Sequence, residues 1–207
     1  MNDYLPTALG QYSEEHAKKV IAYALDQTMQ LIFPEKYAGL CHVYAVVGAN
    51  VLSVCFKSGF RPVAGVAVIP TGAGCLEMLD DIAFTRAVGG AYHCWIESTG
   101  SDKTVLVDFS FGNNSEYSRT CGLVWTKERV DYLWGDESQL NLAKQYPNPP
   151  DNMPDDMVWF QETIRGNRWL WRQLEQHQNE YAQITSLVLR RIRLDIEDRL
   201  NDKKCSP

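Results

Sequence analysis

The sequence lacks a long apolar run and an excess of basic residues, and we expect it to have no leader. No stretch approaches the roughly 20 apolar residues of a membrane helix. The N-terminus, MNDYLPTALGQYSEEH, has neither the basic start nor the apolar core of a secretory signal. The 20 Lys and Arg against 26 Asp and Glu give a net charge of −6, which argues against nucleic acid or anionic lipid as the main partner. We therefore expect a cytoplasmic protein that binds neither membranes nor nucleic acids.

Closely spaced cysteines are also missing, although six cysteines are present. Scattered thiols in a chain without a leader predict reduced cysteines and no disulfide framework. No two of them stand two to four residues apart, so a structural zinc site is not expected. The 207 residues are 45% hydrophobic and 22% charged, which is typical of a folded globular domain that needs neither a metal nor a disulfide for its core, and we expect no cofactor.

The pattern of the chain predicts a single α+β domain with a core over residues 1–150 and a helical extension over 151–207. Ser13 is a good N-cap for a first helix that Pro34 ends. A second helix from about Cys41 to Ser58 is apolar nearly all round, which predicts a central, buried helix. The segments RPVAGVAVIP, AYHCWIES and KTVLVDFS are typical of strands.

The extension begins after a proline-rich segment, YPNPPDNMP, that predicts a surface loop. Two helical stretches are expected beyond it. The first carries Trp159, Phe160, Ile164, Trp169 and Leu170, and the second has apolar residues at steps of four from Ile184 to Leu200. We expect these helices to pack on the core or to form a homodimer contact.

Two of the four histidines adjoin a cysteine, in Cys41-His42 and His93-Cys94. The strand of His93 and the following strand are separated by residues 99–102, which fit a two-residue type II′ hairpin turn. In that register, Asp108 faces His93 closely enough to accept a ring N–H. The other predicted pairs are Trp95 with Leu106 and Glu97 with Thr104. Period-2 alternation places His93, Trp95, Leu106 and Asp108 on one face, with Cys94 and Val107 on the other.

A histidine oriented by a carboxylate is half of a nucleophilic triad, and Cys41 is the best candidate for the nucleophile. It follows a Gly-containing loop at the start of the buried helix, where the helix dipole favours a thiolate. A zinc site from Cys41, His42, His93 and Cys94 is the rival interpretation. It is disfavoured, because neighbouring residues point in different directions on a helix or a strand.

The segments around these residues resemble the transglutaminase-like branch of the papain-like cysteine proteinases. The resemblance rests on Gly39 and Cys41 at a helix start, on the small and aliphatic helix that ends in Gly59-Phe60-Arg61-Pro62, on His93-Cys94-Trp95-Ile96-Glu97 and on Val107-Asp108. It covers about residues 37–112. It implies a papain-like fold, in which a central N-terminal helix packs on an antiparallel sheet.

The resemblance implies that Cys41 is the nucleophile, that His93 is the base and that Asp108 orients the imidazole. The oxyanion site would use the Cys41 N–H and an upstream donor. Because no Gln lies between residues 31 and 40, Tyr37 is the candidate for that donor, and His42 and Trp95 are candidates for the site wall.

The leading hypothesis is thiol-dependent acyl transfer on a small-molecule or peptide acyl substrate, by hydrolysis or aminolysis through a thioester. A second hypothesis is a catalytically inactive binding module of the same fold, with the cleft covered by aromatic residues of the extension (Trp159, Trp169, Trp171). A third is a structural protein that dimerises through residues 178–207.

Overall fold

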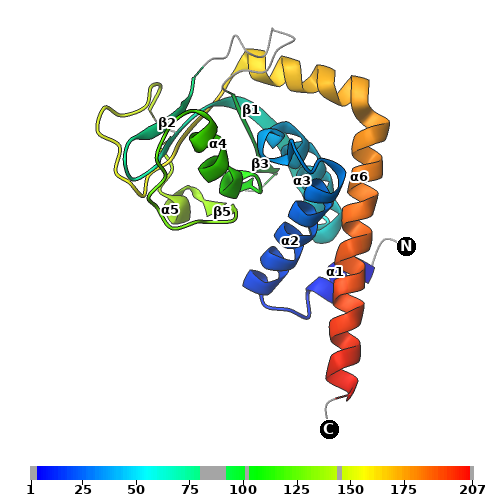
Figure 1. Ribbon diagram of the computed structural model, residues 1–207. Coiled ribbons are helices and arrows are strands. Elements are labelled where there is room, and N and C mark those ends of the chain that lie inside the picture. The colour runs from blue at the N-terminus through cyan, green and yellow to red at the C-terminus, as the bar shows by residue number, and fades with distance from the viewer. Residues whose placement is uncertain (1–3, 80–91, 101–102, 144–145, 206–207) are drawn as a thin grey trace.

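The computed structural model describes residues 4–79, 92–100, 103–143 and 146–205, and has α+β architecture with one antiparallel sheet (Figure 1). The helices are α1 (Tyr4–Leu9), α2 (Glu14–Ile32), α3 (Cys41–Phe56), α4 (Asn114–Thr120), α5 (Glu137–Leu140) and α6 (Ile164–Cys205), with the 3₁₀ turns η1 (Tyr37–Gly39) and η3 (Phe111–Asn113). The strands are β1 (Gly59–Pro70), β2 (Cys75–Met78), β3 (His93–Thr99), β4 (Val105–Asp108), β5 (Leu133–Asp136) and β6 (Trp159–Glu162). Among the described residues, no helix has the length and apolar character to cross a membrane.

The two N-terminal helices expected from the sequence are confirmed. The Ser13 hydroxyl accepts the His16 N–H and caps α2. Helix α3 begins at Cys41 and is buried on most of its sides, because Val, Ala, Gly and Leu occupy nearly every turn. It packs across β1 and β3, while α2 and α6 pack around it (Figure 1).

The sheet has the order β2-β1-β3-β4-β5, and β6 also pairs with β1. All of these pairs are antiparallel. Gly65 of β1 has His93 as its neighbour on one side and Glu162 of β6 on the other. A Cβ atom at position 65 would lie 2.0 Å from the Gln161 carbonyl oxygen, so only glycine permits this close approach of β6.

The predicted register between β3 and β4 is wrong by two residues. Glu97 pairs with Leu106 and Ile96 with Val107, in place of the expected pairs of Glu97 with Thr104, Trp95 with Leu106 and His93 with Asp108. The cause is a longer connection: β3 continues to Thr99 and β4 begins only at Val105. The last two residues of the expected turn, 101 and 102, lie outside the described residues.

A shift of two residues keeps every side chain on its predicted face. Trp95 and Leu106 belong to one hydrophobic cluster, whereas Cys94, Ile96 and Val107 belong to the cluster on the opposite face. The second cluster contains the buried sides of α2, α3 and α6. The first is covered by α4, α5 and the loops around them. The sheet therefore separates two cores.

The extension after the proline-rich segment is not wholly helical. The first expected helical stretch includes Trp159 and Phe160, but these two residues lie in β6, which pairs with β1, and the helix begins only at Ile164. Both side chains are buried, and they belong to two different clusters, as expected for neighbouring residues of a strand. Helix α6 then follows and bends sharply at His177, whose φ and ψ of −118° and 22° are not helical (Figure 1).

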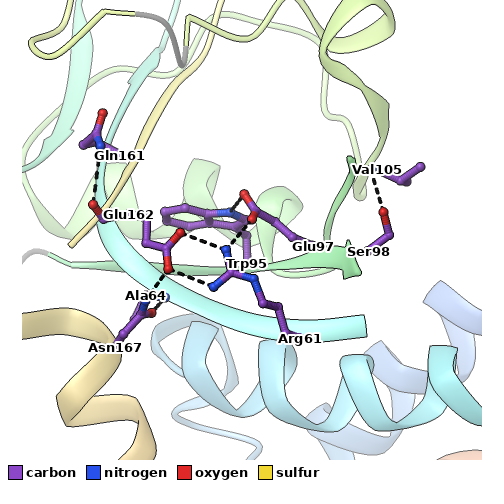
Figure 2. Close-up of polar contacts among 9 residues, drawn as sticks. All are labelled: Arg61, Ala64, Trp95, Glu97, Ser98, Val105, Gln161, Glu162 and Asn167. Atoms are coloured by element: carbon purple, nitrogen blue, oxygen red, sulfur yellow. Dashed lines mark hydrogen bonds and ion pairs between the residues drawn. The ribbon is translucent and has the colours of Figure 1, made fainter. Parts of the chain in front are cut away.

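Arg61 joins three strands through its guanidinium group (Figure 2). It lies on β1 and donates to Glu97 on β3 at 2.8 Å and to Glu162 on β6 at 2.8 Å. Glu97 also accepts the Trp95 indole N–H at 3.1 Å. Next to this group, the Asn167 side chain of α6 accepts the Ala64 N–H at 3.0 Å (Figure 2). These contacts attach β6 and α6 to the central strands.

Candidate active site

A small cavity of about 60 Å³ lies where the start of α3, the start of β3 and the segment after β4 meet. It brings together Cys41 and His93, which are 52 positions apart in the sequence. The lining residues are Ala38, Gly39, Cys41, Met78, Tyr92, His93, Ser110, Asn114 and Tyr117. Most of the wall is apolar or aromatic, with a few polar groups.

Cys41 is the first residue of α3, and its side chain is only 9% exposed. The preceding turn η1 is compact: the Leu40 N–H donates to the Tyr37 carbonyl, and the N–H groups of Val43 and Tyr44 donate to the Leu40 carbonyl. The first N–H groups of a helix have no partner within the helix and carry partial positive charge. The Cys41 thiol therefore lies in a position that favours its anionic form.

His93 and Asp108 are hydrogen-bonded in the buried part of the site. The His93 Nε2 and the Asp108 Oδ2 are 2.6 Å apart, and the two side chains are 2% and 1% exposed. Ser110 secures the carboxylate, because its N–H and its hydroxyl both donate to Asp108 Oδ1, at 2.9 and 2.7 Å. With Nε2 held by Asp108, Nδ1 is the ring nitrogen left for other contacts.

The charges of this group shift the pKa values of Cys41 and His93 in opposite directions. Burial alone lowers the pKa of His93, but the negative charge and hydrogen bond of Asp108, with smaller contributions from Cys41, raise it to about 10. The pKa of Cys41 is lowered well below its ordinary value by hydrogen bonding with Cys94 and then with His93, against the opposing effect of burial. The arrangement thus favours a thiolate beside an imidazolium at neutral pH.

Cys94 is the second thiol of this group and lies on the opposite face of β3 from His93, beside Cys41. Burial and the neighbouring Cys41 raise the pKa of Cys94 well above its ordinary value. A neutral Cys94 S–H can donate to a Cys41 thiolate, and this interaction explains why the two thiols differ in charge state.

Aromatic residues from α6 and from the start of β3 cover one side of the cavity. The Tyr92 ring lines the cavity and lies 4.9 Å from the Trp169 ring, centroid to centroid. His42 is 5.3 Å from Trp169 and its Nδ1 is 3.4 Å from the Tyr92 hydroxyl. Of the three tryptophans expected over the cleft, Trp169 is the one in contact with a lining residue. Trp171 is 66% exposed, and Trp159 is buried in a separate cluster.

The three weaker candidates lie near the cavity but do not line it. The Tyr37 hydroxyl donates to Glu116 at 3.2 Å. His42 contacts Tyr92, and burial lowers its pKa. Trp95 is buried between strands, where it stacks on Phe160 at 5.1 Å and donates to Glu97. Within the described residues there is no group of three or more His, Cys, Asp or Glu side chains placed to hold a metal ion.

Sequence reasoning did not identify two polar lining residues, Ser110 and Asn114. The signal for Ser110 was present, because a serine two positions after an aspartate commonly donates to its carboxylate in a turn. Asn114 begins α4, a short polar helix, NSEYSRT, with no apolar period to mark it. Its place beside Cys41 and His93 depends on the fold of the segment after β4.

Comparison with known proteins identifies a similar fold only. No family model and no curated protein matches the chain. A crystal structure of a protein named only as genomics APC5867 is similar, with a TM-score of 0.55 and 17% sequence identity over 81% of this chain and 75% of that one. At this identity the match supports the α+β fold and carries no function.

Proposed function

We propose that this protein catalyses thiol-dependent acyl transfer on a papain-like fold, with Cys41, His93 and Asp108 as its triad. The observation that carries the proposal is the buried 2.6 Å contact between His93 and Asp108, next to a thiol at a helix N-terminus. A nucleophile, a base and a group that orients the base are the three parts of such a site. The resemblance to the transglutaminase-like branch is consistent with their order in the chain.

In the first half of the reaction, the Cys41 thiolate attacks the carbonyl carbon of an amide or ester. The carbonyl π electrons move to oxygen, and the negative oxygen accepts the free N–H at the start of α3. The C–S bond is then complete, the bond to the leaving group breaks, and the His93 Nδ1 gives its proton to the departing amine or alcohol. A thioester on Cys41 and a neutral imidazole remain.

In the second half, His93 takes a proton from water or from an amine acceptor, which attacks the thioester carbonyl. Collapse of the tetrahedral intermediate breaks the C–S bond and releases an acid or a new amide. The Cys41 thiolate and the protonated His93 are restored. Asp108 accepts the Nε2–H throughout and stabilises the imidazolium without changing its own protonation.

The test is covalent labelling by p-nitrophenyl acetate, followed by mass spectrometry of each cysteine peptide. We expect an acetyl group on Cys41 of the wild-type protein and none on the Cys41→Ala protein. The matched control is Cys55→Ala, because Cys55 lies in the same helix and burial raises the pKa of its thiol to about 12. The proposal is wrong if Cys41→Ala is acetylated as fast as the wild type. An inactive binding module is indicated if neither protein reacts.

A further inference from the structure

Asn114 carries an unused hydrogen-bond donor at the cavity. Its side chain lines the cavity with Cys41 and His93 and is only 5% exposed. Its amide nitrogen, Nδ2, is buried and has no hydrogen-bond partner among the described residues. A buried donor without a partner destabilises a fold by roughly 1–3 kcal/mol. Such a group calls for a ligand that accepts its hydrogen bond.

We infer that the Asn114 amide is the second oxyanion donor of the proposed acyl-transfer site. The inference rests on the proposed function, because it assigns the donor to the carbonyl oxygen of the acyl substrate. The other donor is the backbone N–H at the start of α3, on the Cys41 side of the cavity. No glutamine precedes Cys41, and the Tyr37 hydroxyl is directed to Glu116. Asn114, which lines the same cavity as Cys41, fills this role.

The lining of the cavity indicates which acyl groups fit. Met78, Tyr92 and Tyr117 line the cavity, and among the residues that the structure describes no Lys, Arg, Asp or Glu side chain does. A cavity of about 60 Å³ with an apolar wall and one amide donor suits a small uncharged acyl group.

The test compares acylation with alkylation of Cys41 in the Asn114→Ala and Asn114→Leu proteins. Acylation by p-nitrophenyl acetate creates an oxyanion and should slow by about 10²- to 10³-fold. Alkylation by iodoacetamide creates none and should keep its wild-type rate. If both rates fall together, the triad is disturbed and Asn114 has no separate role. A different outcome is that wild-type Cys41 reacts with iodoacetamide as slowly as an ordinary thiol, while acylation still depends on Asn114. In that case the claim that Cys41 is a thiolate is wrong, and the inference about Asn114 stands.

Thermal unfolding separates a functional role from a structural one. Removal of an unpartnered buried donor should leave the melting temperature unchanged or raise it, while acylation falls. Asn113→Ala is the matched control, since Asn113 is also buried, at 6% exposure, but does not line the cavity. It should keep the wild-type acylation rate. Unchanged acylation in both folded Asn114 variants would overturn the inference, as would a large loss of stability in both.

A second, independent feature is an apolar groove of about 520 Å³ between α2 and α6. Tyr23 and Leu31 of α2 and Leu187 and Leu194 of α6 line it and are 48% to 76% exposed. Exposed apolar residues in one continuous groove mark an interaction surface. Beyond the core, the end of α6 runs on as a single helix (Figure 1).

We propose that this groove binds a second copy of the chain, with the two α6 helices antiparallel about a two-fold axis at Leu194. In that arrangement, Arg190 of one copy lies opposite Asp198 of the other, on both sides of the axis. Both residues line the groove. Neither has an ion pair within the described part of the chain, whereas Asp195 is bound by Arg199 at 2.9 Å. The surface is therefore complementary to itself in charge and in apolar character.

Sedimentation velocity over a wide range of protein concentration tests this arrangement. The wild type should be a dimer, and Leu194→Glu, Arg190→Glu and Asp198→Arg should each shift it to monomer. The double variant Arg190→Glu/Asp198→Arg should restore the dimer, because the charges are exchanged across the axis. Trp171→Ser, at an exposed position outside the groove, should remain dimeric. A wild-type monomer, or a double variant that stays monomeric, would refute the arrangement.

Discussion

His93 and Asp108 are hydrogen-bonded at 2.6 Å although they do not face each other across the β3–β4 ladder. The observed register places Asp108 opposite Trp95, so His93 reaches it along the diagonal on the same face of the sheet. Diagonal neighbours in antiparallel strands remain within reach of an extended ring. Ser110 then fixes the carboxylate from the other side.

Replacing Asp108 by Asn should remove the charge that keeps His93 protonated. The pKa of His93 should fall from about 10, because burial, which opposes protonation, then dominates. Acetylation of Cys41 by p-nitrophenyl acetate should slow by about 10²- to 10⁴-fold. The control is Asp26→Asn, which removes a carboxylate that accepts the Tyr44 hydroxyl away from the cavity. Equal rates for Asp108→Asn and wild type would show that Asp108 plays no part.

The His93–Asp108 pair should also make stability depend on pH, most clearly in a Cys41→Ala background. The folded-state pKa of His93 is raised above the ordinary 6.5, so the folded protein holds a proton that the unfolded chain releases. This stabilisation is complete below pH 6.5 and is lost as the pH rises through the folded-state pKa, which Asp108 still raises in this background. Urea unfolding across this range measures it. Adding Asp108→Asn should reverse the trend, with stability lost in acid, because burial then lowers the pKa.

Arg61→Met should destabilise the fold by about 1–3 kcal/mol, measured by urea unfolding. The substitution removes the bonds of the guanidinium group to Glu97, whose side chain is only 9% exposed, and to Glu162. Arg193→Met is the control. It removes an exposed pair with Glu197 on α6 and should cost only about 0.3–0.5 kcal/mol. If both variants lose the same unfolding free energy, the contacts of Arg61 with Glu97 and Glu162 stabilise the fold no more than a surface ion pair does.

Trp169→Ala should open the site to larger reagents. The ring of Trp169 contacts Tyr92, a lining residue, and His42, so its loss widens the approach to a thiol that is 9% exposed. The rate of Cys41 modification by 5,5′-dithiobis(2-nitrobenzoate) should rise more than the rate with iodoacetamide. The control is Trp171→Ala, which removes a ring that is 66% exposed and should change neither rate. Equal increases for both reagents would indicate loosening of the whole site.

Helix caps and hydrophobic patterns correctly predicted the elements that depend on neighbouring residues in the sequence. The Ser13 cap, the all-apolar helix from Cys41 and the strands of His93 and Asp108 each follow from a few neighbouring residues. The register of β3 and β4 could not be derived in this way, because it depends on the length of their connection. Because the error is two residues, each side chain stays on its predicted face, and His93 and Asp108 are still close enough to form a hydrogen bond.

Features that depend on distant contacts were missed. Trp159 and Phe160 form a strand because β6 can pair with β1, which Gly65 allows it to approach closely. Helix α4, which places Asn114 at the cavity, is polar and has no apolar period. The bend of α6 at His177 is not marked by a proline or a glycine, so the sequence pattern carries no signal for it.

The most direct test of the proposed triad is the rate of Cys41 alkylation by iodoacetamide as a function of pH, followed on the Cys41 peptide by mass spectrometry. Only the thiolate reacts, and the pKa of Cys41 is lowered well below 9.0. The rate should therefore be nearly constant around neutral pH and fall only in acid, while the rate of free N-acetylcysteine in the same solution rises toward alkaline pH. A Cys41 rate that climbs in parallel with that of N-acetylcysteine would contradict the proposal.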